Sequence, residues 1–220
     1  MNAPEVAPLL PSVPVLRELC RAMAAVEFLV APDNSYRTHS FDRGWSEPWD
    51  LAGMDNGGGD NYSIVLSAEA ALIRCFDHES PMSPYVAVDE GLWPGLTDGL
   101  PPVFASLLKH PDFSPEGVFE ATALLWREEG DGAWRTATVE FPPEDRGDDG
   151  AAWLLGRLTA ADPASAFTEH LSVQYGTAVD PAAVAHVFDG GALTTEVAAA
   201  LNPVVADPSA LAIRASVECG

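Results

Sequence analysis

The sequence predicts an α+β fold: a mostly antiparallel sheet built from two hairpins, with helices packed on one face and a C-terminal helical cluster. Short β-favouring segments lie in the middle of the chain, and amphipathic helical patterns precede and follow them. No regular alternation of strands with crossover helices is visible, which argues against a parallel sheet. Within the 220 residues, we expect residues 1–14 to form a flexible leader and residues 15–220 to form a single domain.

The first helix is predicted from apolar spacing. Met1–Pro14 is rich in proline and has no basic residue, so it lacks the pattern of a signal peptide and is expected to be a leader. From Val15 to Val30, apolar residues recur at three- and four-residue intervals, which is typical of an amphipathic helix. Over Tyr36–Trp49 we expect a short strand followed by a loop.

The first hairpin joins Tyr62–Leu66 to Ala71–Phe76 through a short polar connection. In the expected antiparallel register, the last residue of the first strand faces the first residue of the second. One step beyond the other end of this ladder, Asp60 faces Asp77. The open end of the hairpin is therefore predicted to be acidic.

The second hairpin pairs Phe119–Trp126 with Trp134–Phe141 around a turn rich in Gly, Glu and Asp. Aligning Trp126 with Trp134 gives one continuous apolar face, so this register is expected. Between the two hairpins, Leu92–His110 is expected to contain a short helix that begins near its two consecutive prolines.

The C-terminal third is predicted to be mostly helical, with Asp180 as an N-cap and Gly176 as a C-cap. At the very end, Leu211–Val217 alternates apolar and other residues at period two, which favours an edge strand. The expected helices are Ala151–Leu158, Ala164–Tyr175, Pro181–Phe188 and Thr195–Leu201.

Charge is the strongest functional signal. Thirty-three Asp and Glu residues against 11 Lys and Arg residues give a formal net charge of -22. Such a surface repels phosphate and favours cationic partners, so nucleic acid is excluded as a partner and a cationic protein is expected. The alternative is that the acidity reflects the composition of the host and implies no partner.

The three cysteines and the hydropathy pattern indicate the compartment. Cys20, Cys75 and Cys219 are far apart and form no Cys-x-x-Cys pair, so reduced thiols are expected. No apolar stretch reaches the length of a membrane span, because charged residues interrupt the only candidate. We therefore expect a cytoplasmic protein that does not associate with membranes.

The acidic glycine loop before the first hairpin and the segment after it form a candidate metal site. The oxygen atoms of Asp55, Asp60, Asp77 and Glu79 suit calcium or magnesium, and His78 beside them could carry a proton. The alternative is a solvated connection, because the spaced pattern of an EF-hand loop is absent.

Tryptophans and the acidic turn of the second hairpin form a candidate binding surface. Trp126 and Trp134 are expected either to pair across the strands or to anchor a partner, and Trp93 lies in loop-like sequence. The candidate binding residues are Trp93, Trp126, Trp134, Glu128, Glu129 and Asp131.

Common catalytic fingerprints are absent from the sequence. It has no Gly-x-Ser-x-Gly elbow, no phosphate-binding Gly-x-x-x-x-Gly-Lys, no Gly-x-Gly-x-x-Gly and no zinc-ligand spacing among its five histidines. No catalytic residue is assigned, and a binding role is favoured over an enzymatic one.

Three segments carry a resemblance to known proteins. Met54–Asp60, Cys75–Pro84 and Trp126–Trp134 resemble a group of bacterial proteins that is common in actinobacteria and has no assigned activity. In general character, small acidic α+β proteins of this kind are also similar to immunity proteins of bacterial toxin systems, which neutralise a toxin by covering it. The resemblance implies a binding protein and assigns no role to any residue.

The sequence thus predicts an acidic protein of immunity or inhibitor type that binds a cationic protein partner, such as a toxin. A metal-assisted enzyme at the acidic loop and a structural domain without a partner are the alternatives. They differ in what they require of the surface, because only the first needs carboxylates gathered beside exposed aromatic anchors.

Overall fold

A computed structural model describes the chain except for residues 87–90, 115–116, 144–147 and 220. The chain divides into two compact units, each built from two separate stretches of sequence. Unit 1 comprises Met1–Val13 and Met54–Gly156, and unit 2 comprises Pro14–Gly53 and Arg157–Gly220. Neither unit consists of one contiguous stretch of the chain.

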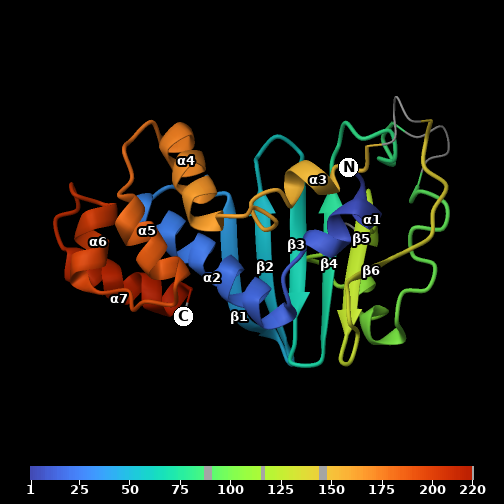
Figure 1. The fold of residues 1–220 in the computed structure, drawn as a ribbon, viewed down its shortest axis with the longest axis horizontal. Helices are drawn as coiled ribbons and strands as arrows, with labels where there is room; N and C mark the ends of the chain where they lie inside the picture. Colours follow the sequence, from blue (N-terminus) through green and yellow to red (C-terminus); the bar gives the residue numbers. More distant parts are fainter. Residues whose placement is uncertain (87–90, 115–116, 144–147, 220) are drawn as a thin grey trace. The chain divides into compact units, whose positions relative to one another are not determined.

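Six strands form an antiparallel sheet, and the α+β prediction is confirmed (Figure 1). The strands follow one another in the sheet in the order of the chain, β1-β2-β3-β4-β5-β6. Their bounds are β1 His39–Ser46, β2 Trp49–Asp55, β3 Asn61–Leu66, β4 Ala70–Phe76, β5 Ala123–Glu128 and β6 Arg135–Thr136.

The β3–β4 hairpin has the predicted register. Leu66 pairs with Ala71 and Tyr62 with Cys75, as expected from the apolar pattern. The connection is closed by Ser67, whose backbone N–H donates to Ala70 O at 2.8 Å. Both strands are mostly buried, so any other register would move polar residues into the core.

The second predicted hairpin is shorter than expected and its register is shifted by one residue. Trp126 faces Arg135 in the structure, so the expected alignment with Trp134 is wrong. The turn explains the shift: the Asp131 side chain accepts a hydrogen bond from the backbone N–H of Glu128 at 2.9 Å and lengthens the connection. β5 also pairs with β4, which the hairpin pattern alone did not predict.

The N-terminal residues pack onto unit 1, although we expected a flexible leader. Short helices α1 (Ala3–Val6) and η1 (Ala7–Leu9) bury several apolar side chains. The indole Nε1 of Trp134 donates to Pro11 O at 2.8 Å. Trp134 lies outside the β5–β6 ladder and instead holds the N-terminal segment in place. The proline-rich composition therefore encodes a packed turn-and-helix segment.

The long connection between β4 and β5 contains only short 3₁₀ helices among its described residues. They are η2 (Pro102–Phe104) and η3 (Leu107–Lys109), in place of the short helix that we expected. Pro102 lacks a backbone N–H and permits only a tight first turn. After β6, helix α3 covers Ala151–Leu154 and is shorter than predicted.

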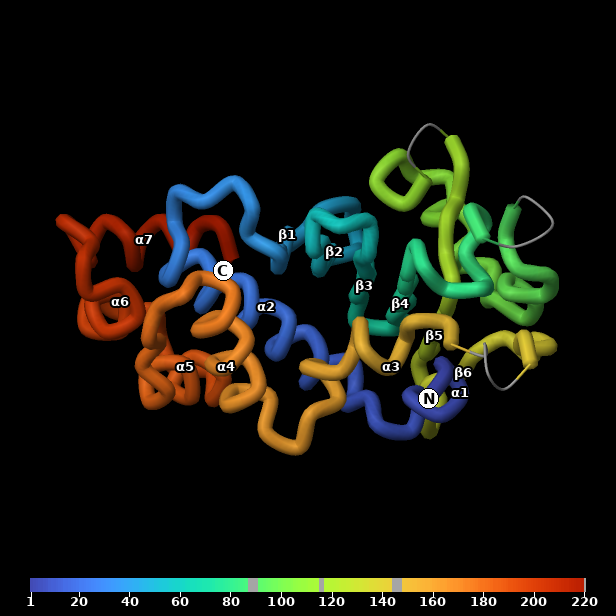
Figure 2. Tube along the Cα trace, turned by 90° about the horizontal axis from the view of Figure 1, so that it is seen from above, coloured from blue at the N-terminus to red at the C-terminus, as the bar shows by residue number. Residues whose placement is uncertain are grey.

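Unit 2 is built around α2 (Val13–Val30), whose apolar face is buried as predicted. Figures 1 and 2 show the C-terminal helices gathered around it. Those helices are α4 Pro163–Tyr175, α5 Pro181–Phe188, α6 Thr195–Leu201 and α7 Pro208–Glu218.

An Asp-Pro pair begins three of these helices. Asp162, Asp180 and Asp207 each accept a backbone hydrogen bond as N-cap, and each is followed by proline at the first helical position. The edge strand predicted over Leu211–Val217 is wrong, because this segment lies within α7. The Asp-Pro signal was present in the sequence and outweighs the period-two alternation.

Two further expectations concern thiols and membranes. All three cysteines are free and buried, as a packing role predicts. Within the described part of the chain, no helix is both long enough and apolar enough to cross a membrane.

Candidate functional site

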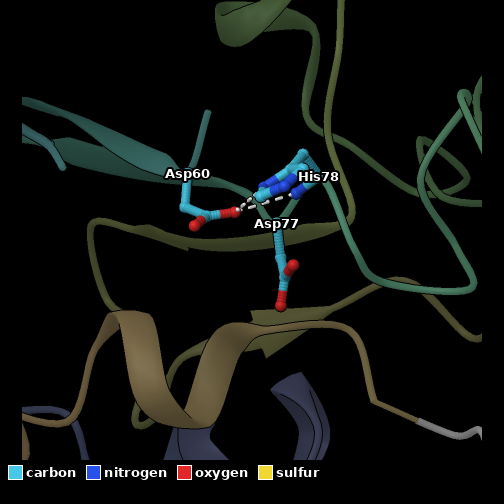
Figure 3. Close-up of side chains that lie close together, drawn as sticks. All are labelled: Asp60, Asp77 and His78. Carbon is cyan, nitrogen blue, oxygen red and sulfur yellow. Dashed lines mark hydrogen bonds and ion pairs between the residues drawn. The ribbon is translucent and has the colours of Figure 1, made fainter. Parts of the chain in front are cut away.

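The β3–β4 hairpin brings Asp60 and His78 together. Asp60 directly precedes β3, His78 is the second residue after β4, and antiparallel pairing places both at the same end of the sheet. His78 Nδ1 lies 2.6 Å from Asp60 Oδ1, and the His78 backbone N–H donates to the same oxygen at 3.0 Å. Figure 3 shows this pair.

The loop around Asp60 holds its carboxylate in place. Asn56 Nδ2 donates to Asp60 Oδ2 at 2.8 Å. Gly59 has a φ of +106°, and a Cβ at this position would lie 3.3 Å from the His78 ring. Only glycine takes this backbone conformation easily while leaving room for the imidazole.

Asp60 and His78 shift each other's protonation in the direction of an ion pair. Burial alone would raise the pKa of Asp60, but hydrogen bonds from His78 and Asn56 outweigh it and lower the pKa. The hydrogen bond to Asp60 raises the pKa of His78. The side chain of His78 is 43% exposed and that of Asp60 is 11% exposed, so a partner can reach the imidazole more easily than the carboxylate.

Asp77 lies close to this pair but has a structural role. Its Oδ1 accepts hydrogen bonds from the backbone N–H groups of Glu79 and Ser80, at 3.0 and 3.1 Å. Its Oδ2 accepts from Trp153 Nε1 at 2.8 Å. In Figure 3 the Asp77 carboxylate points away from Asp60 and His78, toward α3. Asp77 thus fastens the segment after β4 to α3.

The structure brings only part of the predicted metal set together. Ligand atoms of Asp60, Asp77 and His78 lie within 4.8 Å of one another. Asp55 and Glu79 are exposed and lie outside this group. Calcium requires six to eight oxygen ligands, so the three clustered side chains could hold such a cation only with additional ligands.

Exposed aromatic side chains accompany the carboxylates at this end of the sheet, a feature the sequence analysis missed. Tyr85 is 70% exposed and its hydroxyl bonds the Glu120 carboxylate, while Trp153 is 44% exposed and bonds Asp77. Tyr85 lies nine residues after β4 and Trp153 lies beyond β6, and their contacts with Glu120 and Asp77 depend on tertiary packing rather than on a local pattern. We call Asp55, Asp60, Asp77, Glu79, Glu120 and Asp148 the acidic end of unit 1.

Arg74 lies in β4, beneath the acidic end. Its guanidinium donates to Glu120 O at 3.1 Å and to the Asn61 side chain. Burial lowers the pKa of Arg74, and the charges of Glu120 and Asp55 act in the opposite direction. Because this cation is buried, it reduces the repulsion between the carboxylates without presenting positive charge to a partner.

The predicted tryptophan anchors are not exposed in the structure. Trp126 and Trp134 are both buried in unit 1, and Trp93 is half-buried with its Nε1 donating to Glu140 O at 2.9 Å. Because Trp126 faces Arg135, the two hairpin tryptophans do not form a directly opposed pair. They pack the hairpin and the N-terminal segment.

One carboxylate in the acidic turn of the second hairpin, that of Asp131, is paired with an arginine. The Arg127 guanidinium donates to Asp131 O, and Arg135 forms an ion pair with the Asp131 carboxylate. Glu128 is half-buried and Glu129 is exposed. At the acidic end, the exposed carboxylates of Asp55, Glu79 and Asp148 form no ion pair with Lys or Arg among the described residues.

A second histidine–carboxylate pair lies in unit 2 and is fully buried. His39 Nδ1 is 2.7 Å from Glu27 Oε2, and Glu27 also accepts from Tyr175 Oη at 2.6 Å and from Thr38 N at 2.9 Å. Burial would raise the pKa of Glu27, but the hydrogen bonds from His39 and Tyr175 lower it to about 2. Sequence spacing gave no sign of this cluster, because its members come from α2, β1 and α4.

Comparison with known proteins gives no assignment. No protein-family model, curated protein or solved structure matches this chain. The geometry of the described residues is therefore the basis for a proposal of function.

Proposed function

We propose that this chain is an acidic binding protein of immunity or inhibitor type, which associates with a cationic protein partner through the acidic end of unit 1. The observation that carries the proposal is the set of exposed carboxylates at this end, Asp55, Glu79 and Asp148, which form no ion pair with Lys or Arg among the described residues. Such a surface speeds encounter with a positive partner and selects it against others.

The distribution of the arginines supports this proposal. Arg17, Arg21, Arg135 and Arg214 form ion pairs with carboxylates elsewhere, and Arg74 is buried. Each compensated arginine removes positive charge that could have neutralised the acidic end.

Tyr85 and Trp153 are the aromatic contacts that we propose for the partner. Interface energy is concentrated in aromatic residues and arginine, and a cation placed over an aromatic ring gains further attraction. Trp153 Nε1 is already bonded to Asp77, which fixes the indole before a partner arrives. These two residues take the place of the buried hairpin tryptophans as proposed anchors.

A matched pair of double variants tests the location of the surface. Asp55→Asn with Glu79→Gln removes two charges at the acidic end, and Glu128→Gln with Glu129→Gln removes two charges at the β5–β6 turn. An arginine-rich peptide titrated by calorimetry at low salt should bind the first double variant more weakly than the second. Equal loss in both variants would show that only net charge matters, and unchanged binding in both would contradict the proposal.

A second candidate function is metal-assisted or acid–base chemistry at Asp60 and His78. The half-exposed imidazole, held at Nδ1 by a largely buried carboxylate, is the arrangement by which a general base is oriented. If calcium or magnesium binds here, each should raise the melting temperature of the native protein. That rise should be lost in the Asp60→Asn, Asp77→Asn double variant, and an equal rise in both proteins would exclude this site.

A further inference from the structure

His170, on α4 of unit 2, lies in an environment that opposes a positive charge. Its Nδ1 is 2.8 Å from the Arg157 guanidinium, and its ring centroid is 5.6 Å from that of His39 at an interplanar angle of 82°. The Nε2 atoms of both histidines are buried and have no hydrogen-bond partner among the described residues.

The contact with Arg157 determines the tautomer of His170. A guanidinium N–H can only donate, so His170 Nδ1 must accept and the neutral ring carries its proton on Nε2. A second proton, placed on Nδ1, would put an N–H against the cationic guanidinium. Protonation of His170 would therefore break the contact between Arg157 and α4.

Among the described residues, the carboxylate that acts on His170 already accepts several hydrogen bonds. Glu27 is the acidic group that faces this cluster, and its oxygens already accept from Thr38, His39 and Tyr175. These donors come from α4 itself and from the segment of β1 and the residue before it. Tyr175 is the donor from α4, so its hydrogen bond to Glu27 is the one that joins α4 to α2 in the closed arrangement.

The charged neighbours of His170 on all the packed elements act mainly in one direction. Burial has the largest effect, Arg157 and His39 add to it, and Glu27 opposes it, so that the pKa of His170 falls to about 4. In an open, solvated position the same imidazole would have the ordinary pKa of about 6.5.

We propose that α4 is an acid-sensitive latch of unit 2: it closes over Glu27 and His39 while His170 is neutral, and mild acid releases it. Release exposes the buried side chains Phe167 and Leu171, which α4 contributes to the core of the unit. This property is independent of the proposed binding function, because every residue in it belongs to unit 2.

The direction of the pH effect follows from the two protonation states. A histidine whose pKa is depressed in the closed state supports closure fully above its ordinary pKa, and this support is lost as the pH falls toward the depressed value. Between about pH 6.5 and about pH 4, the ratio of open to closed α4 should rise by up to about tenfold per pH unit.

Amide hydrogen exchange of the full chain, corrected for intrinsic rates, measures this opening. At about pH 5, the protection of α4 relative to α7 should be lower than at about pH 7 by about tenfold or more. The His170→Asn variant keeps an acceptor near Arg157 but cannot be protonated, so its α4 protection should be independent of pH over this range.

Two further variants keep the inference falsifiable. His186→Asn changes an exposed histidine on α5 and should leave the acid response of α4 as in the native protein. If His170→Asn fails to fold, an NMR titration of the native protein replaces it, and an imidazole of His170 that titrates near 6.5 would overturn the latch. Equal acid loss of α4 protection in native protein and His170→Asn would overturn it as well.

Discussion

Two histidine–carboxylate pairs in this protein have nearly the same geometry and opposite surroundings. The Nδ1–oxygen distance is 2.7 Å between His39 and Glu27 and 2.6 Å between His78 and Asp60. The His39 side chain is 2% exposed, whereas that of His78 is 43% exposed. The two pairs therefore differ in their exposure to solvent and not in the distance between their atoms.

The surroundings determine what each pair can do. The Glu27 carboxylate is fully buried and accepts hydrogen bonds from Thr38, His39 and Tyr175. The Asp60 carboxylate fixes one side of an imidazole that a ligand can still reach. The first pair is a stabilising centre of unit 2, and the second is the part of unit 1 that is open to recognition or proton transfer.

The largest expected effect is on the buried pair. Glu27→Gln replaces an acceptor oxygen by an N–H₂ group among several donors, and should lower the free energy of unfolding by about 3 kcal/mol or more. Denaturant unfolding measures the change. Glu18→Gln on the same helix alters an exposed partner of Arg21 and should cost less than about 1 kcal/mol. Similar costs for both variants would remove the distinction between the pairs.

A smaller effect is expected from the exposed pair. Asp60→Asn removes a charged acceptor of bonds from His78 and Asn56, and should lower the free energy of unfolding by about 1–2 kcal/mol. The variant should also move the pKa of His78 back toward its ordinary value, as an NMR titration would show. A His78 titration unchanged by this substitution would mean that the carboxylate does not control the imidazole.

Gly59→Ala tests the space beside the imidazole. Gly59 and Gly57 both have positive φ, but a Cβ at Gly59 would meet the His78 ring at 3.3 Å while a Cβ at Gly57 would meet nothing within 4 Å. Each alanine should cost about 1 kcal/mol through backbone strain. Only Gly59→Ala should also shift the His78 ring resonances in an NMR spectrum, and identical spectra would count against the packing described for this loop.

The smallest effect is the opposite pH dependence of the two pairs. The raised pKa of His78 means that its contribution to stability is present below the ordinary pKa of about 6.5 and is lost as the pH rises through the raised value. The lowered pKa of Glu27 means that its contribution is present above about 4.5 and is lost as the pH falls toward about 2. The free energies of unfolding of Asp60→Asn, Glu27→Gln and the native protein, measured at several pH values, would separate the pH dependences of the two pairs.

Local patterns predicted the elements that local chemistry determines. The apolar face of α2, the register of β3 with β4 and the caps of α4 and α5 follow from spacing, strand pairing and N-cap residues. The neighbourhood of Asp60 and Asp77 was predictable for the same reason, because one hairpin contains both. The register places Asp77 opposite Asp60, and the hydrogen bond between His78 and Asp60 is a detail that the structure adds.

Distant contacts were beyond such patterns. The burial of Trp134 depends on Pro11, and the role of Trp153 depends on Asp77. The Glu27 cluster depends on Tyr175, which is 148 positions away in the chain. In α7, the prediction failed for a different reason: apolar alternation was given more weight than the Asp207-Pro208 start signal.

The discontinuity of the two units has a consequence for synthesis. All residues of unit 1 have been joined once Gly156 is added, so this unit can complete its core at that stage. Helix α2, made much earlier, belongs to a unit that is complete only after α4–α7 have been made, and its side chains Met23 and Phe28 are buried in the folded protein. A nascent chain halted near Gly156 would contain a complete unit 1 and a helix α2 whose apolar face is still exposed. Such species are the kind that chaperones bind.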